Sequence, residues 1–128
     1  WIYSNPEHSV EERNEAWLSI YNRFGAGFVD WTGYDDVKTN LWQKQLHLFE
    51  VPFYYDEYAI AQLGAIAVWR NYKQNPEKAL EDYLSALKLG YTKTIGEIYQ
   101  TAGIQFNFSK EYVHELMQFV KTELDKLD

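Results

Sequence analysis

The most informative stretch of the sequence is His47-Leu-Phe-Glu-Val-Pro-Phe-Tyr-Tyr-Asp-Glu-Tyr58-Ala-Ile-Ala-Gln-Leu-Gly64. It carries a histidine, a proline and three tyrosines, and an apolar helical sequence follows at once. The proline ring locks the backbone and fixes a bend at that point. Polar aromatic donors held against a rigid, buried element are suited to gripping a peptide or stabilising a developing negative charge. The stretch is therefore the predicted centre of the fold and the candidate site.

With the segments on either side of this stretch, the sequence predicts an all-α protein, a compact multi-helix array in a single helical domain over residues 1–128. A central helix is expected over about 54–73, and its middle, residues 59–69, is apolar on nearly every face. A helix that is apolar all round is expected to be buried all round. Residues 49–53 are expected to be extended, because Pro52 disfavours helix at the residue before it.

Local signals at the helix ends predict the remaining helices. Ser9 with Glu12, and Thr94 with Glu97, form capping-box patterns, and Ser109 and Asn75-Pro76 mark two more helix starts. The predicted helices cover about 10–24, 36–48, 76–89, 95–101 and 110–127, with Gly25, Gly90 and Gly103 as stops.

Composition excludes several classes of function. The 128 residues carry a formal net charge of −7, which argues against nucleic-acid binding, since phosphate contacts need clustered Lys and Arg. The chain has no cysteine, so it has no disulfide scaffold and no thiol nucleophile, and a cytoplasmic protein is expected. No apolar run is long enough for a membrane span. The chain starts at Trp1, so it is expected to be a piece of something longer.

Two candidate sites compete with simpler structural interpretations. The segment His114-Glu-Leu-Met-Gln118 has Gln where a zinc-protease helix needs its second histidine, so it is interpreted as an ordinary helix turn. His47 could be a packed structural histidine, and Tyr54, Tyr55 and Tyr58 could be core aromatics. On a helix, either Tyr54 or Tyr55 could share a face with Tyr58, and spacing does not decide between them.

A longer pattern gives these residues a family context. The site stretch reads Trp42-x4-His47-x-Phe49-Glu50-Val51-Pro52-Phe53-Tyr54-Tyr55-x2-Tyr58-x2-Ala61-Gln62-Leu63. Weaker matches are Glu11-Glu12-Arg13-x3-Trp17, Trp69, Tyr83-x2-Ala86-Leu87-x2-Gly90 and Ala102-Gly103-Ile104-x-Phe106-x-Phe108-Ser109. Over essentially its whole length, the chain resembles the C-terminal part of oligoendopeptidase F, in the thimet-oligopeptidase family of zinc metallopeptidases.

The resemblance implies a fold, an activity and a set of roles. It implies the C-terminal lobe of a helical zinc metalloendopeptidase that hydrolyses short oligopeptides. His47 and Tyr58 would take catalytic roles near the tetrahedral oxyanion, and His47 with Tyr54 and Tyr55 would bind substrate. A tyrosine hydroxyl is still a donor at neutral pH, which suits it to that role. Which of Tyr54 and Tyr55 faces the substrate is left open.

The chain departs from the family pattern in one respect: it lacks the His-Glu-x-x-His motif. No metal ligand is therefore predicted here, and zinc is expected in the full-length parent, on ligands outside these residues. The expected partners are short peptides and the missing N-terminal part of the same chain, and the 128 residues alone are expected to be inactive. Two alternatives stay open: a non-catalytic helical interaction module, suggested by the tetratricopeptide-like segment 75–90, and a relative that has lost its catalytic half.

Overall fold

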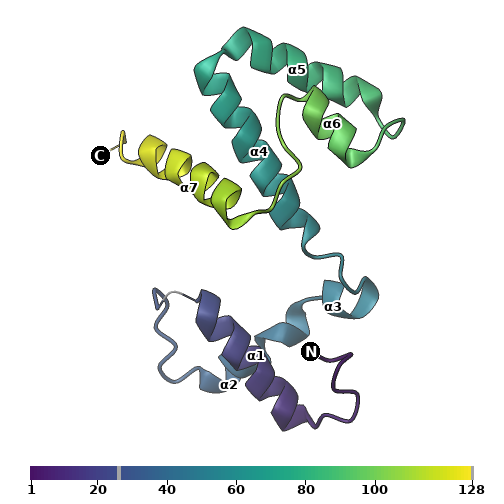
Figure 1. The fold of residues 1–128 in the computed structure, drawn as a ribbon. Helices are drawn as coiled ribbons and strands as arrows, with labels where there is room; N and C mark the ends of the chain where they lie inside the picture. Colours follow the sequence, from purple (N-terminus) through teal and green to yellow (C-terminus); the bar gives the residue numbers. More distant parts are fainter. Residues whose placement is uncertain (26, 128) are drawn as a thin grey trace. The chain divides into compact units, whose positions relative to one another are not determined.

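The computed structural model describes residues 1–25 and 27–127. Within these ranges every regular element is helical, so the all-α prediction is confirmed (Figure 1). The elements are α1 (Val10–Phe24), α2 (Asp35–Asn40), the 3-10 helix η1 (Leu41–Lys44), α3 (His47–Glu50), α4 (Glu57–Gln74), α5 (Pro76–Leu89), α6 (Ile95–Thr101) and α7 (Lys110–Leu124). None of the described helices is both long and apolar enough to cross a membrane.

The chain divides into two compact units, Trp1–Tyr55 and Asp56–Asp128. Each unit has its own packing and is described by itself. The interpretation of residues 1–128 as one domain of a longer peptidase stays a prediction.

Trp42 is the buried centre of the first unit. Its indole N–H donates to the Asn14 side chain of α1 at 2.9 Å, and the Arg13 guanidinium lies 5.2 Å from the centre of its ring. A second indole, that of Trp17, donates to the Lys38 carbonyl at the end of α2 at 3.0 Å. Two tryptophan donors therefore tie α1 to the segment that leads into the candidate site.

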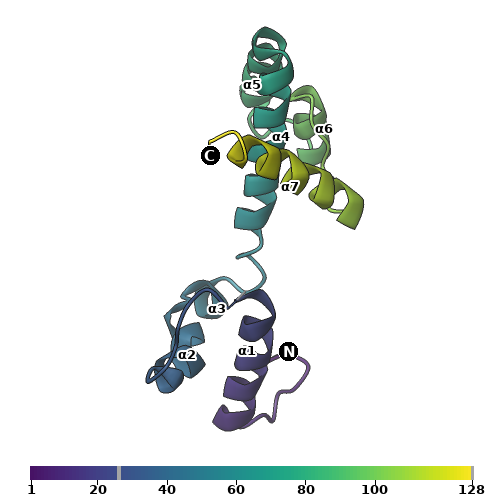
Figure 2. The same cartoon turned by 90° about the vertical axis from the view of Figure 1, so that its left-hand side faces the viewer.

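In the second unit, α4 carries the core. The core cluster joins small and large apolar residues from α4, α5, α7 and the segment after α6, namely Ala67, Ala86, Ala102, Ile104, Tyr112 and Leu116. Figures 1 and 2 both show α6 alongside α5 and α7 crossing α4. Alanines at these contacts leave room for the helix axes to come close together.

Polar contacts also fasten α7 and the segment before it onto α4. Arg70 pairs with Glu115 at 2.6 Å and Lys73 with Glu123 at 2.8 Å. The Asn71 amide donates to the Gly103 carbonyl at 2.8 Å. Gly103 has a φ of 71°, a conformation that glycine adopts without steric cost, so the chain can turn there and present that carbonyl.

The helix starts marked by Ser9, Asn75, Thr94 and Ser109 were predicted correctly. The capping boxes at Ser9 and Thr94 form as expected, Asn75 and Ser109 cap α5 and α7, and Gly25 caps the end of α1. The last helix ends at Leu124 rather than at residue 127.

Three predictions around the candidate site were wrong. The helix expected over 36–48 is interrupted: α2 stops at Asn40, and Gln45 leaves helical geometry with ψ near 85°. The Thr39 hydroxyl donates to the Asp35 carbonyl, and the Asn40 amide donates to the Asp36 carbonyl. These side chains compete with backbone N–H groups for the same carbonyls, which weakens the end of the helix. Residues 49–50 lie in α3 instead of being extended, because α3 begins at His47 and reaches Glu50.

The third error concerns α4, which starts at Glu57 rather than near residue 54 and is not buried all round. Gly64 and Ala67 are buried, whereas Ala61, Ala65, Trp69 and Tyr72 are open or half-open. The described residues cover only part of the surface of α4. A prediction made from its apolar sequence alone therefore overestimated its burial.

Candidate functional site

A tight turn at residues 51–54 sets the backbone of the candidate site. The Tyr54 N–H donates to the Val51 carbonyl at 3.2 Å, which closes a four-residue turn with Pro52 and Phe53 at its centre. Phe53 has a φ of 63°. Proline followed by a residue of positive φ fits a type II turn, whose third position usually holds glycine or asparagine. A phenylalanine there costs about 1–2 kcal/mol of backbone strain.

Contacts between aromatic rings involve residues of this turn and residues on either side of it within the first unit. His47 and Tyr55 lie with ring centroids 4.6 Å apart, tilted by 34°. Phe49 contacts the buried Trp42 at 5.9 Å, and Phe53 stacks on Tyr3 at 5.4 Å. The short helix α3 and the turn therefore bring His47 and Tyr55, eight positions apart in sequence, into direct contact.

The structure brings together some of the sequence-predicted site residues. His47 is half-buried at the start of α3. Tyr54, the last residue of the turn, and Tyr55, which follows it, are about half exposed. Tyr58 is the second residue of α4 and belongs to the other unit. Because Tyr54 and Tyr55 precede α4, the expectation that either shares a helix face with Tyr58 was wrong. The convergence of Tyr58 with His47 stays a prediction.

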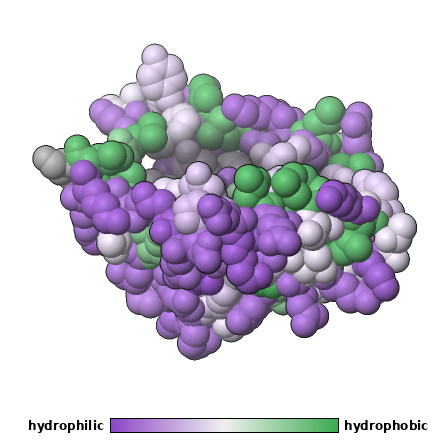
Figure 3. All heavy atoms as spheres, turned by 90° about the horizontal axis from the view of Figure 1, so that it is seen from above, coloured by the Kyte–Doolittle hydropathy of each residue, from purple (hydrophilic) through white to green (hydrophobic). Residues whose placement is uncertain are grey.

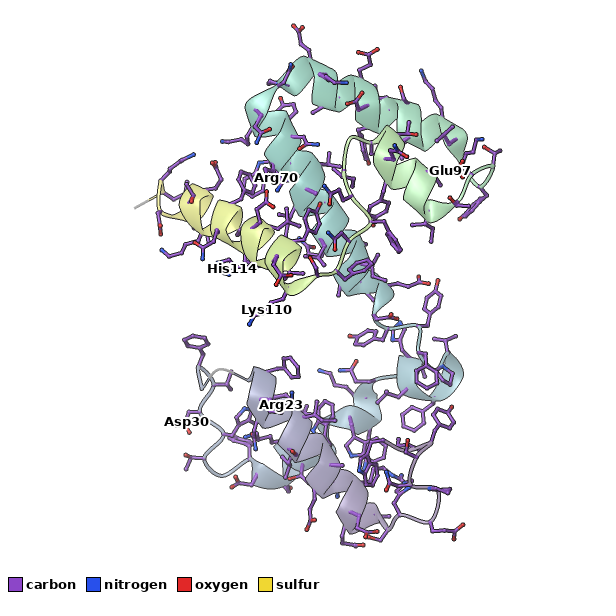
Figure 4. The ribbon with its side chains drawn as sticks, in the orientation of Figure 1. Arg23, Asp30, Arg70, Glu97, Lys110 and His114 are labelled. Carbon is purple, nitrogen blue, oxygen red and sulfur yellow. The ribbon has the colours of Figure 1, made fainter. Side chains whose placement is uncertain are left out.

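The described residues do not fit a metal ion. No group of three or more His, Cys, Asp or Glu side chains with suitable spacing occurs in residues 1–25 and 27–127. His8 is held by Arg13, whose Nε donates to its Nε2 at 2.8 Å. His114 is exposed on α7, next to the Glu115 that pairs with Arg70 (Figure 4). Within the described ranges, none of the three histidines has a second and third ligand beside it that could complete a zinc site.

The second unit contains a separate apolar pocket of about 530 Å³. Small residues of α4 and aromatic residues of α4, α5 and α6 line it, among them Gly64, Trp69, Tyr83 and Tyr99. Burial, and secondarily Tyr112, raises the pKa of Tyr99 above its usual range. The Tyr112 hydroxyl is itself buried and has no hydrogen-bond partner within the described part of the chain.

Sequence reasoning did not mark Phe53, Tyr3 or Gly64 as residues of a functional site. Proline at position 52 was a signal for a turn, but nothing in the sequence indicated a positive φ at a phenylalanine. The stacking of Tyr3 on Phe53 joins residues fifty positions apart, and no local pattern encodes such a contact. The pocket likewise depends on how α4, α5 and α6 pack.

Comparison with known proteins assigns the chain to a family. No curated protein and no solved structure matches it. A sequence model described as "Peptidase family M3" matches residues 1–118, which include the turn, the His47–Tyr55 pair and most of α7. Because that match runs through both units and covers nearly all of the 128 residues, the chain belongs to peptidase family M3.

Proposed function

We propose that this chain is the C-terminal, substrate-facing part of a zinc metalloendopeptidase of the oligoendopeptidase F kind, which hydrolyses short oligopeptides. Membership of peptidase family M3 supports a metallopeptidase parent. The observation that carries the assignment to these residues is the His47–Tyr55 ring contact at 4.6 Å, beside a strained turn. Backbone strain of this kind concentrates at functional sites.

In the proposed site, hydrogen-bond donors of this chain bind the peptide and stabilise the transition state. The Tyr58 hydroxyl would donate to the carbonyl oxygen of the scissile bond as negative charge builds up on it. His47, with Tyr54 or Tyr55, would hold the peptide backbone in register. One well-placed donor to such an oxyanion contributes about 3 kcal/mol, or roughly a hundredfold in rate.

Zinc, in this proposal, is held by residues beyond these 128. The part of the proposal that falls to these 128 residues is to bind and orient the peptide. The isolated chain is accordingly expected to cleave no peptide. We also retain a cytoplasmic location as part of the proposal.

The test uses the natural full-length protein that contains residues 1–128. We expect the purified protein to contain about one zinc per chain by elemental analysis and to cleave an internally quenched hexapeptide. Chelation should abolish cleavage, and added zinc should restore it. A full-length protein without zinc and without cleavage, or cleavage by the repurified 128-residue chain alone, would overturn the proposal.

A second candidate is a helical module that binds another protein. The observation that favours it is the apolar pocket between α4, α5 and α6, lined by Tyr72, Leu80 and Tyr83, all of which are open. Peptide titration separates the two candidates. A module should bind one defined partner tightly without cleaving it, whereas a peptidase should turn over many short peptides.

A further inference from the structure

Phe53 occupies a backbone position that the rest of the chain gives to glycine. Among the described residues, the other positions with positive φ are Gly27, Gly33, Gly90 and Gly103. Glycine reaches this conformation without a steric penalty, whereas a phenylalanine Cβ does not. A phenylalanine kept at such a position needs a reason that lies in its side chain.

Burial does not provide that reason. The Phe53 side chain is 86% exposed, so it contributes almost nothing to a core. Its ring stacks on that of Tyr3, at 5.4 Å and an interplanar angle of 27°, and Tyr3 is itself exposed. The two stacked rings therefore form an open, uncharged aromatic surface on the first unit.

The location of this surface connects it to the site. In the turn, Phe53 directly precedes Tyr54, and Tyr55, the next residue, contacts His47. A flat apolar surface favours aromatic and branched aliphatic groups over charged ones. A peptide held by His47 and the tyrosines would pass beside these rings.

We propose that Phe53 determines substrate specificity: with Tyr3, it contacts an apolar side chain of the bound peptide next to the groups that hold the peptide backbone. This inference rests on the proposed peptidase function. It adds that the parent enzyme prefers an aromatic or branched aliphatic residue at one position of the peptide. It also explains why the turn keeps a ring where glycine would relax the backbone.

The experiment compares three variants of the natural full-length protein, Phe53→Gly, Phe53→Asn and Phe53→Tyr. Glycine and asparagine both suit a positive φ and remove the ring, while tyrosine keeps a ring on the same strained backbone. The substrates are quenched hexa-alanine and six versions of it, each with one alanine replaced by phenylalanine. The readouts are kcat/KM for each peptide and the melting temperature of each protein.

In the wild-type protein, phenylalanine at one peptide position should raise kcat/KM above that of hexa-alanine. This gain should shrink about five- to tenfold in Phe53→Gly and Phe53→Asn and persist in Phe53→Tyr. The melting temperature should not fall in the glycine variant, because the strain is relieved. An undiminished gain in the glycine and asparagine variants, or no phenylalanine preference in an active wild type, would overturn this inference alone. A wild type that cleaves none of the seven peptides would overturn the peptidase proposal and this inference with it.

Discussion

Gly64 in the middle of α4 makes the closest approach to another side chain among the described glycines. A Cβ added at Gly64 would lie 2.9 Å from the Tyr99 hydroxyl and 3.2 Å from Tyr99 Cζ. Tyr99 packs against the core, and its hydroxyl also lies 3.4 Å from the Ile60 carbonyl, so the ring has little freedom to move aside. The sequence shows a glycine in an otherwise helical run but not the ring that requires it.

We expect Gly64→Ala to destabilise the 128-residue chain by about 1 kcal/mol. Alanine adds about 1 kcal/mol of helix propensity, but forcing a methyl group into a close contact costs about 1–3 kcal/mol. The second effect dominates because the added Cβ would clash directly with Tyr99. Urea unfolding followed by circular dichroism measures the difference. The matched control is Gly96→Ala in α6, where the added Cβ meets nothing within 4 Å and should stabilise the chain. Equal stabilisation by both substitutions would contradict the close packing of Tyr99.

Tyr58 is the residue whose proposed role is most sharply testable. In the natural full-length protein, Tyr58→Phe should lower kcat roughly a hundredfold while changing KM little, because the hydroxyl acts mainly on the transition state. Steady-state kinetics on one quenched hexapeptide measure both constants. Phe preserves the ring, so the melting temperature serves as the control for folding. An unchanged kcat would remove the oxyanion role from Tyr58 and transfer the test to Tyr54 and Tyr55.

At the scale of elements, features that depend on residues close together in the sequence were predicted well, and features that depend on packing between elements were not. The helix starts at Ser9, Asn75, Thr94 and Ser109 were predicted because a capping residue satisfies backbone N–H groups only three positions away. Such signals lie entirely within one turn of chain. The burial of α4 was mispredicted because it depends on which other elements pack against it.

The candidate site was predicted in its composition but not in its geometry. The resemblance picked out His47 and the three tyrosines, and the structure places His47 against Tyr55. The spacing argument for Tyr54 or Tyr55 with Tyr58 failed because the turn at 51–54 delays the start of α4 to Glu57. Helical spacing relates two residues only when both lie in the same helix.

The capping box of α6 gives a prediction with a pH dependence. The Thr94 backbone N–H and then its hydroxyl donate to the Glu97 carboxylate, which lowers the pKa of Glu97 below its ordinary value. A carboxylate with a lowered folded-state pKa stabilises the fold fully above its unfolded pKa, about 4.3, and the effect disappears as pH falls through the folded pKa. Thr94→Ala should cost about 1 kcal/mol at pH 7 through the lost N-cap.

Urea unfolding at pH 7 and at pH 3 tests both parts of this prediction. The cost of Thr94→Ala should be larger at pH 7, where Glu97 is ionised, than at pH 3. Glu97→Gln serves as the control, since it removes the titrating group but keeps a side chain of similar size, and it should flatten the pH dependence. A Thr94→Ala cost that is identical at the two pH values would show that the hydrogen bond from the Thr94 hydroxyl to the Glu97 carboxylate contributes nothing to this cap.

At the scale of the whole molecule, the chain buries less surface than its size allows. Its accessible surface is 10104 Å², whereas two separate compact globules of 55 and 73 residues would expose about 8,600 Å² together. Apolar side chains lie open among polar ones on the face seen in Figure 3. An excess on the order of 1,500 Å² is the size of one side of a permanent interface. This open surface supports the proposal that further peptidase chain packs on these residues.

The two units should also differ in stability, because their cores differ. Trp42 is the one buried hydrophobic residue described in the first unit, whereas Ala67, Tyr112 and Leu116 belong to the larger core of the second. None of α1, α2 and α3 has a buried residue, and α4, α5 and α7 each have two. Local opening requires less free energy where fewer apolar contacts break.

Hydrogen exchange followed by mass spectrometry tests this difference directly on the 128-residue chain. Amides in α1 should exchange about a hundredfold faster than those in the middle of α4, which corresponds to a difference of about 3 kcal/mol in opening free energy. Leu116→Ala, which empties the fully buried position of the second core, should speed exchange in α4 and α7 and leave α1 nearly unchanged. Trp42→Ala should do the reverse, since its indole ties α1 to the site segment. Equal protection of α1 and α4, with both substitutions affecting both units alike, would mean that residues 1–128 unfold as one cooperative domain.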